Sequence, residues 1–465
     1  MPNIFSTMNV ARQGMMVSQI GLNLTGHNTA NVNTEGFSRR RLEIASRAEA
    51  LGGGTTVEGI KRYTDQFATE RLVHEETLRG YAQERSDILS HVSDLFNDLE
   101  SNGLGSALDA FYGSFRLLES NPNDLTIRQE VIARTEELAQ AFNRVAVELE
   151  TVRANTDNLL RASAAEINVR TEEIAQLNDD IIIAKVQGKD VSDIMDRREQ
   201  LVREMAEHAD ISYIENDNGQ ITVFLEGGMP LVEGNKRSTI EVPDTGMPGG
   251  ARVEYVTDKG LATDVTARIA GGAMGGTLET RDVTLPSLAA DLDQIAYDIT
   301  VAYNNIHAAG VGLDGVTGRN LFNPLGGPAG AATAMAVSAD VDGIPEAIAA
   351  ALNVLPLALP GDNRNALELA NLADLPLAAG ATQTFNEAYA TLVGEVGVTT
   401  RRAESEAMMR SASITRIEAI RDGESGVSLD EEMSNLIQFQ RAYQASARVM
   451  TTINTVLDTL MNLGK

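Results

Sequence analysis

Apolar residues recur at alternating four- and three-residue intervals at both ends of the chain. At the amino end, this N-terminal seam comprises Ile4, Met8, Ala11, Met15, Ser18, Leu22 and Thr25. At the carboxyl end, the C-terminal seam comprises Leu436, Phe439, Tyr443, Ser446, Met450, Ile453, Leu457 and Leu460. This spacing is typical of the a and d positions of a coiled coil. Because a lone helix of this length is marginal in water, both ends are expected to pack against partners.

A second repeat places an apolar residue at every seventh position, at Leu160, Ile167, Ile174 and Ile181. A heptad sustained this long predicts one or two extended helices in a rod-like bundle. Helical periodicity runs from about Asp65 to Asp210 and returns over residues 285–308 and 385–420. A helical framework therefore occupies most of the chain.

The period changes to two between Ile211 and about Leu278. Two β-like runs flank Asp217-Asn218-Gly219, which is a hairpin signal. A further short hairpin is expected over residues 41–58, with Leu42 and Ile44 on the same side. The glycines of segment 271–276 predict a tight connection that leaves the β region. Residues 310–361 are rich in Gly, Ala and Pro, and loops with short helices are expected there.

These patterns predict a mainly α fold with a β insert, that is, a multi-domain α+β protein. We expect a terminal coiled-coil assembly domain of residues 1–35 with 425–465. A mainly helical rod domain would comprise residues 36–210 with 279–424, and a small β-domain would comprise residues 211–278. The assembly domain and the rod domain are thus each expected to combine a segment from the amino-terminal part of the chain with one from the carboxyl-terminal part.

Composition narrows the possible partners. The 465 residues include 66 acidic and 38 basic side chains, a formal charge of −28, so nucleic acid and anionic membranes are poor partners. The densest basic run, Arg39-Arg40-Arg41, is expected to form a solvated turn or to contact the protein's own acidic surface. The chain has no cysteine, which excludes disulfides and thiolate chemistry. The first residues lack the pattern of a signal peptide, and no apolar run approaches the ~18 residues of a membrane span.

Catalytic and metal-binding patterns are weak. The five histidines lie too far apart in sequence for an HExxH-type zinc motif. The many carboxylates fall on helical positions where solvation is the default, although sequence alone leaves a glycosidase pair open. We expect no catalytic residues, no cofactor and no metal site.

Two motifs resemble those of bacterial flagellar axial proteins, the superfamily of rod, hook and hook-associated proteins. The first follows the first helix, which we expect to end by Gly26. It is an Asn-rich turn comprising Asn28, Asn31, Val32, Asn33, Thr34, Gly36 and Phe37. Asn side chains bond to nearby backbone, so an ordered, self-bonded turn is expected. The usual motif has Pro where Glu35 stands and often Tyr in place of Phe37.

The second motif is the segment EEMSNLIQFQRAYQASAR, residues 431–448. Segments 361–366 and 384–389 are most similar to the hook-associated members that join hook to filament. The chain is short for that group and carries one modest β insert. Other axial subunits (hook, rod or flagellin-like) share the terminal motifs. A secreted cell-wall hydrolase with flagellar-type ends is the alternative from another class.

The resemblance implies a structural, extracellular component of the flagellum, without enzymatic activity. It implies export through the flagellar type III apparatus without a cleaved signal peptide, aided by an export chaperone. It further implies self-association into a helical ring between hook protein and a second hook-filament junction protein. Neither nucleic acid nor membrane would be a partner.

Overall fold

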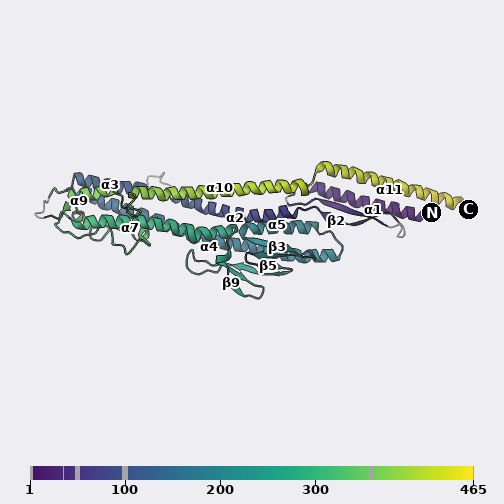
Figure 1. Cartoon of the computed structure of the whole chain (residues 1–465), viewed down its shortest axis with the longest axis horizontal. Coiled ribbons are helices and arrows are strands. Elements are labelled where there is room, and N and C mark those ends of the chain that lie inside the picture. Colours follow the sequence, from purple (N-terminus) through teal and green to yellow (C-terminus); the bar gives the residue numbers. More distant parts are fainter. Residues whose placement is uncertain (1–3, 35, 48–52, 97–102, 355–359, 464–465) are drawn as a thin grey trace.

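The molecule is an elongated array of long helices with both termini at the same end (Figure 1). The computed structural model describes the whole chain except residues 1–3, 35, 48–52, 97–102, 355–359 and 464–465. The predicted mainly α fold with a β insert is confirmed. The end that holds the termini consists of helix α1 (Ile4–Ala30), helix α11 (Leu429–Leu463) and a β-hairpin, β1 (Arg40–Ser46) with β2 (Thr55–Arg62).

The central rod is made of helices that run along its length. They are α2 (Gln66–Leu95), α4 (Leu125–Val186), α5 (Ser192–His208) and α10 (Phe385–Ser425). Near the β insert, α10 packs on α2, α2 on α5, and α5 on α4. The 62 residues of α4 span about 93 Å at 1.5 Å per residue. The heptad residues Leu160, Ile167, Ile174 and Ile181 are fully buried, which confirms the predicted long helix.

The opposite end of the rod has an aromatic core. Helices α3 (Leu104–Ser120), α7 (Leu285–Ala309) and α9 (Arg364–Asn371) surround it. The ring of Phe111 packs on Phe115, Tyr303 and Phe322, with centroids 4.7–5.8 Å apart. The described part of segment 310–361 holds only short elements, as predicted: β10 (Gly310–Val311), α8 (Ala331–Ala334), η4 (Pro345–Ala347) and β11 (Ala351–Leu352).

The β insert begins with the predicted hairpin and forms two small antiparallel sheets. One has the order β3-β4-β5-β6 and the other β7-β8-β9. The strands are β3 (Ile211–Glu215), β4 (Ile221–Leu225), β5 (Met229–Glu233), β6 (Lys236–Arg237), β7 (Thr239–Glu241), β8 (Glu254–Val256) and β9 (Ala262–Asp264). Asn168 of α4 holds the insert because its amide bonds both backbone groups of Ile240, at 2.7 and 2.8 Å.

The glycine-rich segment 271–276 differs from the expected tight connection. It forms most of helix α6 (Gly272–Glu279), which packs mainly against α2 and also contacts α4 and α5. A Cβ on Gly276 would lie 2.5 Å from the carbonyl oxygen of Tyr81, and one on Gly272 would lie 2.4 Å from the backbone of Ala209. Both glycines therefore permit close packing, and Gly272, with φ +67°, also supplies the left-handed backbone at the start of the helix.

A pH dependence of stability follows from Glu84 of α2. Burial, with a smaller contribution from Asp87, raises the pKa of Glu84 from 4.5 to about 7. Between these values the folded state binds more protons than the unfolded state, so the free energy of unfolding should fall as pH rises through this window. We expect Glu84→Gln to flatten this dependence and to stabilise the protein at pH 8. Urea unfolding at pH 5 and pH 8 measures it, with the exposed Glu148→Gln as control. An unchanged pH dependence in Glu84→Gln would contradict the assignment.

Candidate assembly interface

Helices α1 and α11 pack side by side and antiparallel (Figure 1). Gly14 lies against Ser446 and Gly21 against Phe439. Residue numbers thus increase along α1 in the direction in which they decrease along α11, as expected for antiparallel helices. A Cβ on Gly21 would lie 2.6 Å from the Phe439 ring. The two glycines thus let the helices approach closely, a role that the heptad pattern alone does not reveal.

The two predicted seams are covered unevenly within one chain. On α1, Ala11 is buried, and Ile4, Met8, Met15 and Leu22 are half-buried. On α11, Ile453 is buried and Leu436, Phe439, Met450 and Leu457 are half-buried. Tyr443 and Leu460 remain 37% and 53% exposed. The register set by the two glycines places Leu460 beyond the start of α1, so α1 has no residue to cover it.

A second face of α1 packs on the β1–β2 hairpin. The sequence predicted a hairpin here but not its packing against α1. Val17 and Leu24 form a small core with Leu42, and Ile20, Val57 and Ile60 are packed around it. The expectation that Leu42 and Ile44 share a side is wrong. A β-bulge between Glu43 and Ile44 shifts the register, so Leu42 is buried while Ile44 is 46% exposed.

The Asn-rich turn begins later than expected, because α1 continues to Ala30 and does not end by Gly26. The Asn28 amide is buried and bonds both backbone groups of Arg40, at 2.9 and 3.2 Å. The amide of Asn31 donates to the His27 carbonyl, 2.9 Å away. Asn28 therefore makes from within the helix the kind of backbone hydrogen bond that the sequence led us to expect in a loop, whereas Asn31 makes its bond in the turn.

The turn itself is self-bonded, as predicted. The N–H of Thr34 donates to the Asn31 carbonyl, and the N–H of Phe37 donates to the Thr34 carbonyl. Gly36 has φ +77°, a conformation that favours glycine. Val32 is half-buried and Asn33 is exposed. Glu35, where the chain departs from the usual motif, lies outside the described residues.

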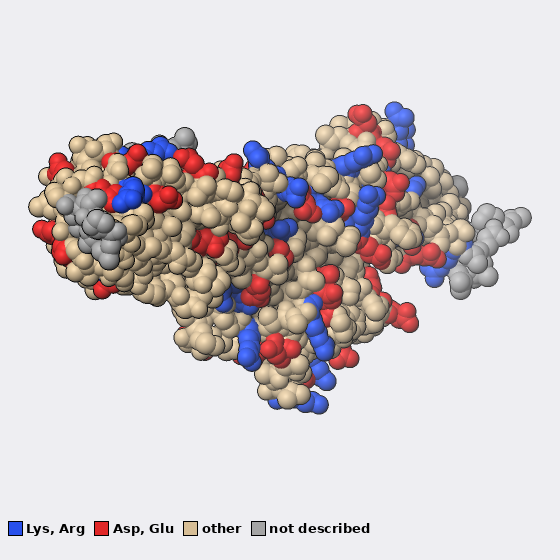
Figure 2. Space-filling model, turned by 60° about the vertical axis from the view of Figure 1, so that its left-hand side comes forward, with Lys and Arg blue, Asp and Glu red and all other residues tan. Residues whose placement is uncertain are grey.

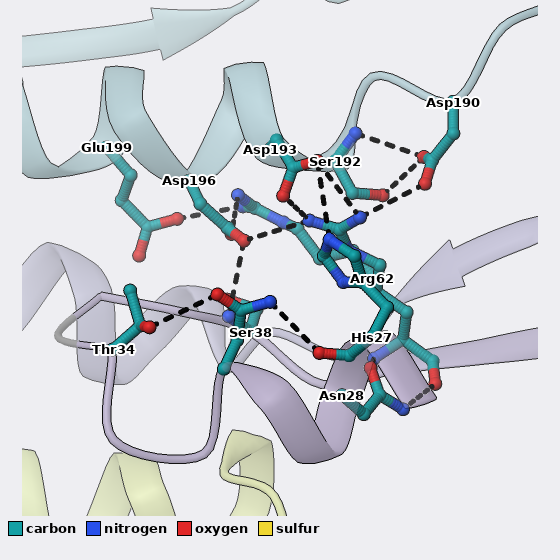
Figure 3. A network of polar contacts seen from close by, with 12 residues as sticks. His27, Asn28, Thr34, Ser38, Arg62, Asp190, Ser192, Asp193, Asp196 and Glu199 are labelled. Atoms are coloured by element: carbon teal, nitrogen blue, oxygen red, sulfur yellow. Dashed lines mark hydrogen bonds and ion pairs between the residues drawn. The ribbon is translucent and has the colours of Figure 1, made fainter. Parts of the chain in front are cut away.

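A network of ion pairs joins this turn and hairpin to α5 (Figure 3). Arg40 is 4% exposed and pairs with Asp193 and, at 3.3 Å, with Asp190. Arg62 pairs with Asp196 at 2.7 Å and Glu199 at 2.8 Å.

Asp196 lies at the centre of the network. It also accepts the backbone N–H of Ser38 at 3.3 Å. Burial raises its pKa, and the positive charge of Arg62 opposes that rise. The terminal end is therefore joined to the rod by ion pairs whose arginines and Asp196 are mostly buried, whereas Asp193 is 67% exposed.

The neighbouring Arg39 joins the same hairpin to the carboxyl-terminal helices. Its side chain pairs with Glu431 and with Glu432, the latter at 2.9 Å. Its backbone N–H donates to the Ser425 carbonyl, also at 2.9 Å. The basic run thus contacts the protein's own acidic residues, one of the two predicted outcomes. On the face shown in Figure 2, acidic and basic side chains are interspersed, with no continuous basic patch.

The described residues contain no group of three or more His, Asp or Glu side chains placed to hold a metal ion. Within the same described ranges, no helix has both the length and the apolar character needed to cross a membrane.

Comparisons with known proteins agree with this architecture. The family model "Flagellar hook-associated protein FlgK helical domain" matches residues 89–322, half of the chain. A second family model, "Flagellar basal body rod FlgEFG protein C-terminal", matches residues 423–463. The hook junction protein FlgK from Burkholderia pseudomallei has a similar fold, with a TM-score of 0.65 and 15% identity over 77% of this chain and 100% of that one.

Two curated relatives are similar over nearly their whole length. Flagellar hook-associated protein 1 of Bacillus subtilis is 26% identical over 99% of both chains. That of Salmonella typhimurium is 25% identical over 98% of this chain and 100% of its own, in an alignment of 553 positions. The chain therefore belongs to the flagellar hook-associated protein FlgK family and is a structural component of the hook-filament junction.

Proposed function

We propose that the paired helices α1 and α11 are the assembly element through which copies of this chain form a helical ring. The ring would sit between hook protein and a second hook-filament junction protein. Residues 1–35 with 425–465 would form the assembly domain, residues 36–210 with 279–424 the rod, and residues 211–278 the outer β-domain. The role is purely structural, without catalysis.

One observation carries this proposal. Even after α1 and α11 have packed together, large apolar side chains remain exposed along α11, at Leu429, Met433, Ile437, Val449, Val456, Leu460 and Met461. A soluble protein rarely leaves so long an apolar surface uncovered unless another molecule binds it. Neighbouring subunits in a polymer would cover this surface.

Export as an unfolded chain through the type III apparatus, with an export chaperone, is part of the same proposal. The chain contains no cysteine, so no disulfide has to form before or after passage. The terminal pair joins segments from opposite ends of the chain, so its folding is coupled to completion of export and to association.

A deletion strain tests the proposed role directly. We expect cells without this gene product to carry bare hooks and to release filament protein into the medium, because nothing joins filament to hook. Electron microscopy of the cells and immunoblots of the medium measure the two effects, with plasmid complementation as control. Normal filaments on the deletion strain would refute the role.

A further inference from the structure

Helix α10 carries an exposed face with no partner in the described chain. The α10 stripe, as we define it, comprises Val398, Arg401, Arg402, Met409, Arg416 and Ile420, which are all exposed. The three arginine side chains make no ion pair with any residue that the structure describes. The remaining members, of which Met409 is 61% exposed, supply apolar surface between the charges. Val398, Met409 and the first two arginines also line a shallow hollow.

A face of opposite charge lies on α4. The α4 stripe, as we define it, comprises Leu159, Val169, Gln176, Asp179, Asp180 and Ile183. Val169 and Ile183 are 61% and 55% exposed. Asp179 and Asp180 form no ion pair within the described ranges, whereas Glu172 of the same helix is paired with Arg237. This stripe therefore combines apolar side chains with free negative charge.

The two stripes match in length and in chemistry. The α10 stripe extends about 33 Å and the α4 stripe about 36 Å at 1.5 Å per residue. Arginine beside apolar surface complements carboxylates beside apolar surface, since guanidinium groups bind carboxylates strongly and in defined geometry. Both stripes therefore have apolar surface that a partner could cover, and their charges, which the described residues leave unpaired, are of opposite sign.

The two stripes lie at opposite edges of the rod. Helices α2 and α5 separate α10 from α4 (Figure 1), so the stripes of one chain cannot meet each other. A surface at one edge that binds a different surface at the other edge of the next copy gives a heterologous interface. Such an interface repeats into a ring or a helix.

We propose that the α10 stripe of one copy binds the α4 stripe of the next copy in the junction. This inference rests on the proposed ring assembly and names the surface that forms its outer wall. The apolar side chains are covered on contact, and Arg401 and Arg402 pair with carboxylates of the neighbour.

Charge reversal with rescue tests the interface. R401E/R402E and D179R/D180R should each reduce the number of filament-bearing hooks about tenfold or more, because like charges then face each other at a cost of more than 1.4 kcal/mol. The chain with all four substitutions should regain attachment, since its stripes are complementary again. K236E/K259E in the β insert, which changes net charge as much as R401E/R402E does, should behave as the unmodified chain.

Filaments are counted by electron microscopy in the deletion strain complemented with each variant, and circular dichroism verifies folding. Normal attachment with either single-face reversal overturns the interface. Failure of the fourfold variant to rescue also overturns it, because the partner would then be a different chain. Both outcomes leave the junction role intact as long as the deletion strain still sheds its filaments.

Discussion

Replacing Gly21 with leucine is expected to separate α1 from α11 and to abolish filament attachment. The Phe439 ring lies 2.6 Å from where a Cβ would stand, well inside the closest approach of two carbon atoms. Leucine adds three further carbon atoms beyond this Cβ, so the Phe439 ring must turn away from α1 and the two helices must move apart. Because the two helices form one surface, a displaced α11 cannot present its exposed apolar side chains to neighbouring subunits in register.

The matched control is Gly26→Leu. Gly26 lies on the same helix, but a Cβ there meets nothing within 4 Å. This change should preserve attachment and raise helix stability by about 1 kcal/mol, since glycine is a poor helix former. Motility and electron microscopy distinguish the two variants. Equal behaviour of Gly21→Leu and Gly26→Leu would show that the close approach at Gly21 is not needed for assembly.

Arg40→Met is expected to release the terminal end from the rod. The arginine is 4% exposed and pairs with Asp190, just before α5, and with Asp193 in its first turn. Removing it takes the cation away from Asp190, which keeps its hydrogen bonds from Ser192, and from Asp193, which is 67% exposed, so we expect a cost of about 1–2 kcal/mol. We expect a lower melting temperature and faster tryptic cleavage in the hairpin that follows the Asn-rich turn.

The adjacent Arg41→Met serves as control, because Arg41 is exposed and forms no ion pair in the part of the chain that the structure describes. It should melt like the unmodified protein, and the remaining Lys and Arg sites of the hairpin should be cleaved at the unmodified rate. If Arg40→Met were as stable as Arg41→Met, the network in Figure 3 would not be what holds the terminal end to the rod.

Heptad spacing predicted the helices at both ends and the long α4, because burial of regularly spaced apolar residues is the strongest signal in a sequence. It did not reveal that α1 buries a second face against a hairpin. The reason lies in Val17 and Leu24, which are spaced by seven residues like a seam but form a core with Leu42 of β1. Periodicity shows that a residue is covered without showing what covers it.

The predictions of a tight connection at residues 271–276 and of a helix end by Gly26 were wrong, again because of contacts that are distant in sequence. Local preference favours turns for glycine and asparagine, yet the glycines of α6 and Asn28 of α1 lie in helices. The glycines of α6 allow its backbone to pack closely on α2. The side-chain amide of Asn28 forms hydrogen bonds with the backbone N–H and carbonyl of Arg40. These are long-range contacts, so they cannot be inferred from the neighbouring sequence.

The meeting of α1 with α11 makes the first helix dependent on the last. Nearly the whole chain must be synthesised before the partner of Ile4–Ala30 exists. Closing so long a loop costs conformational entropy, which the packing of α1 against α11 must offset. A polypeptide that ended between Ser425 and Leu429 would contain every rod helix but would lack the helix that packs against α1. Under the proposed assembly through α1 and α11, a chain without α11 would be unable to join the growing structure.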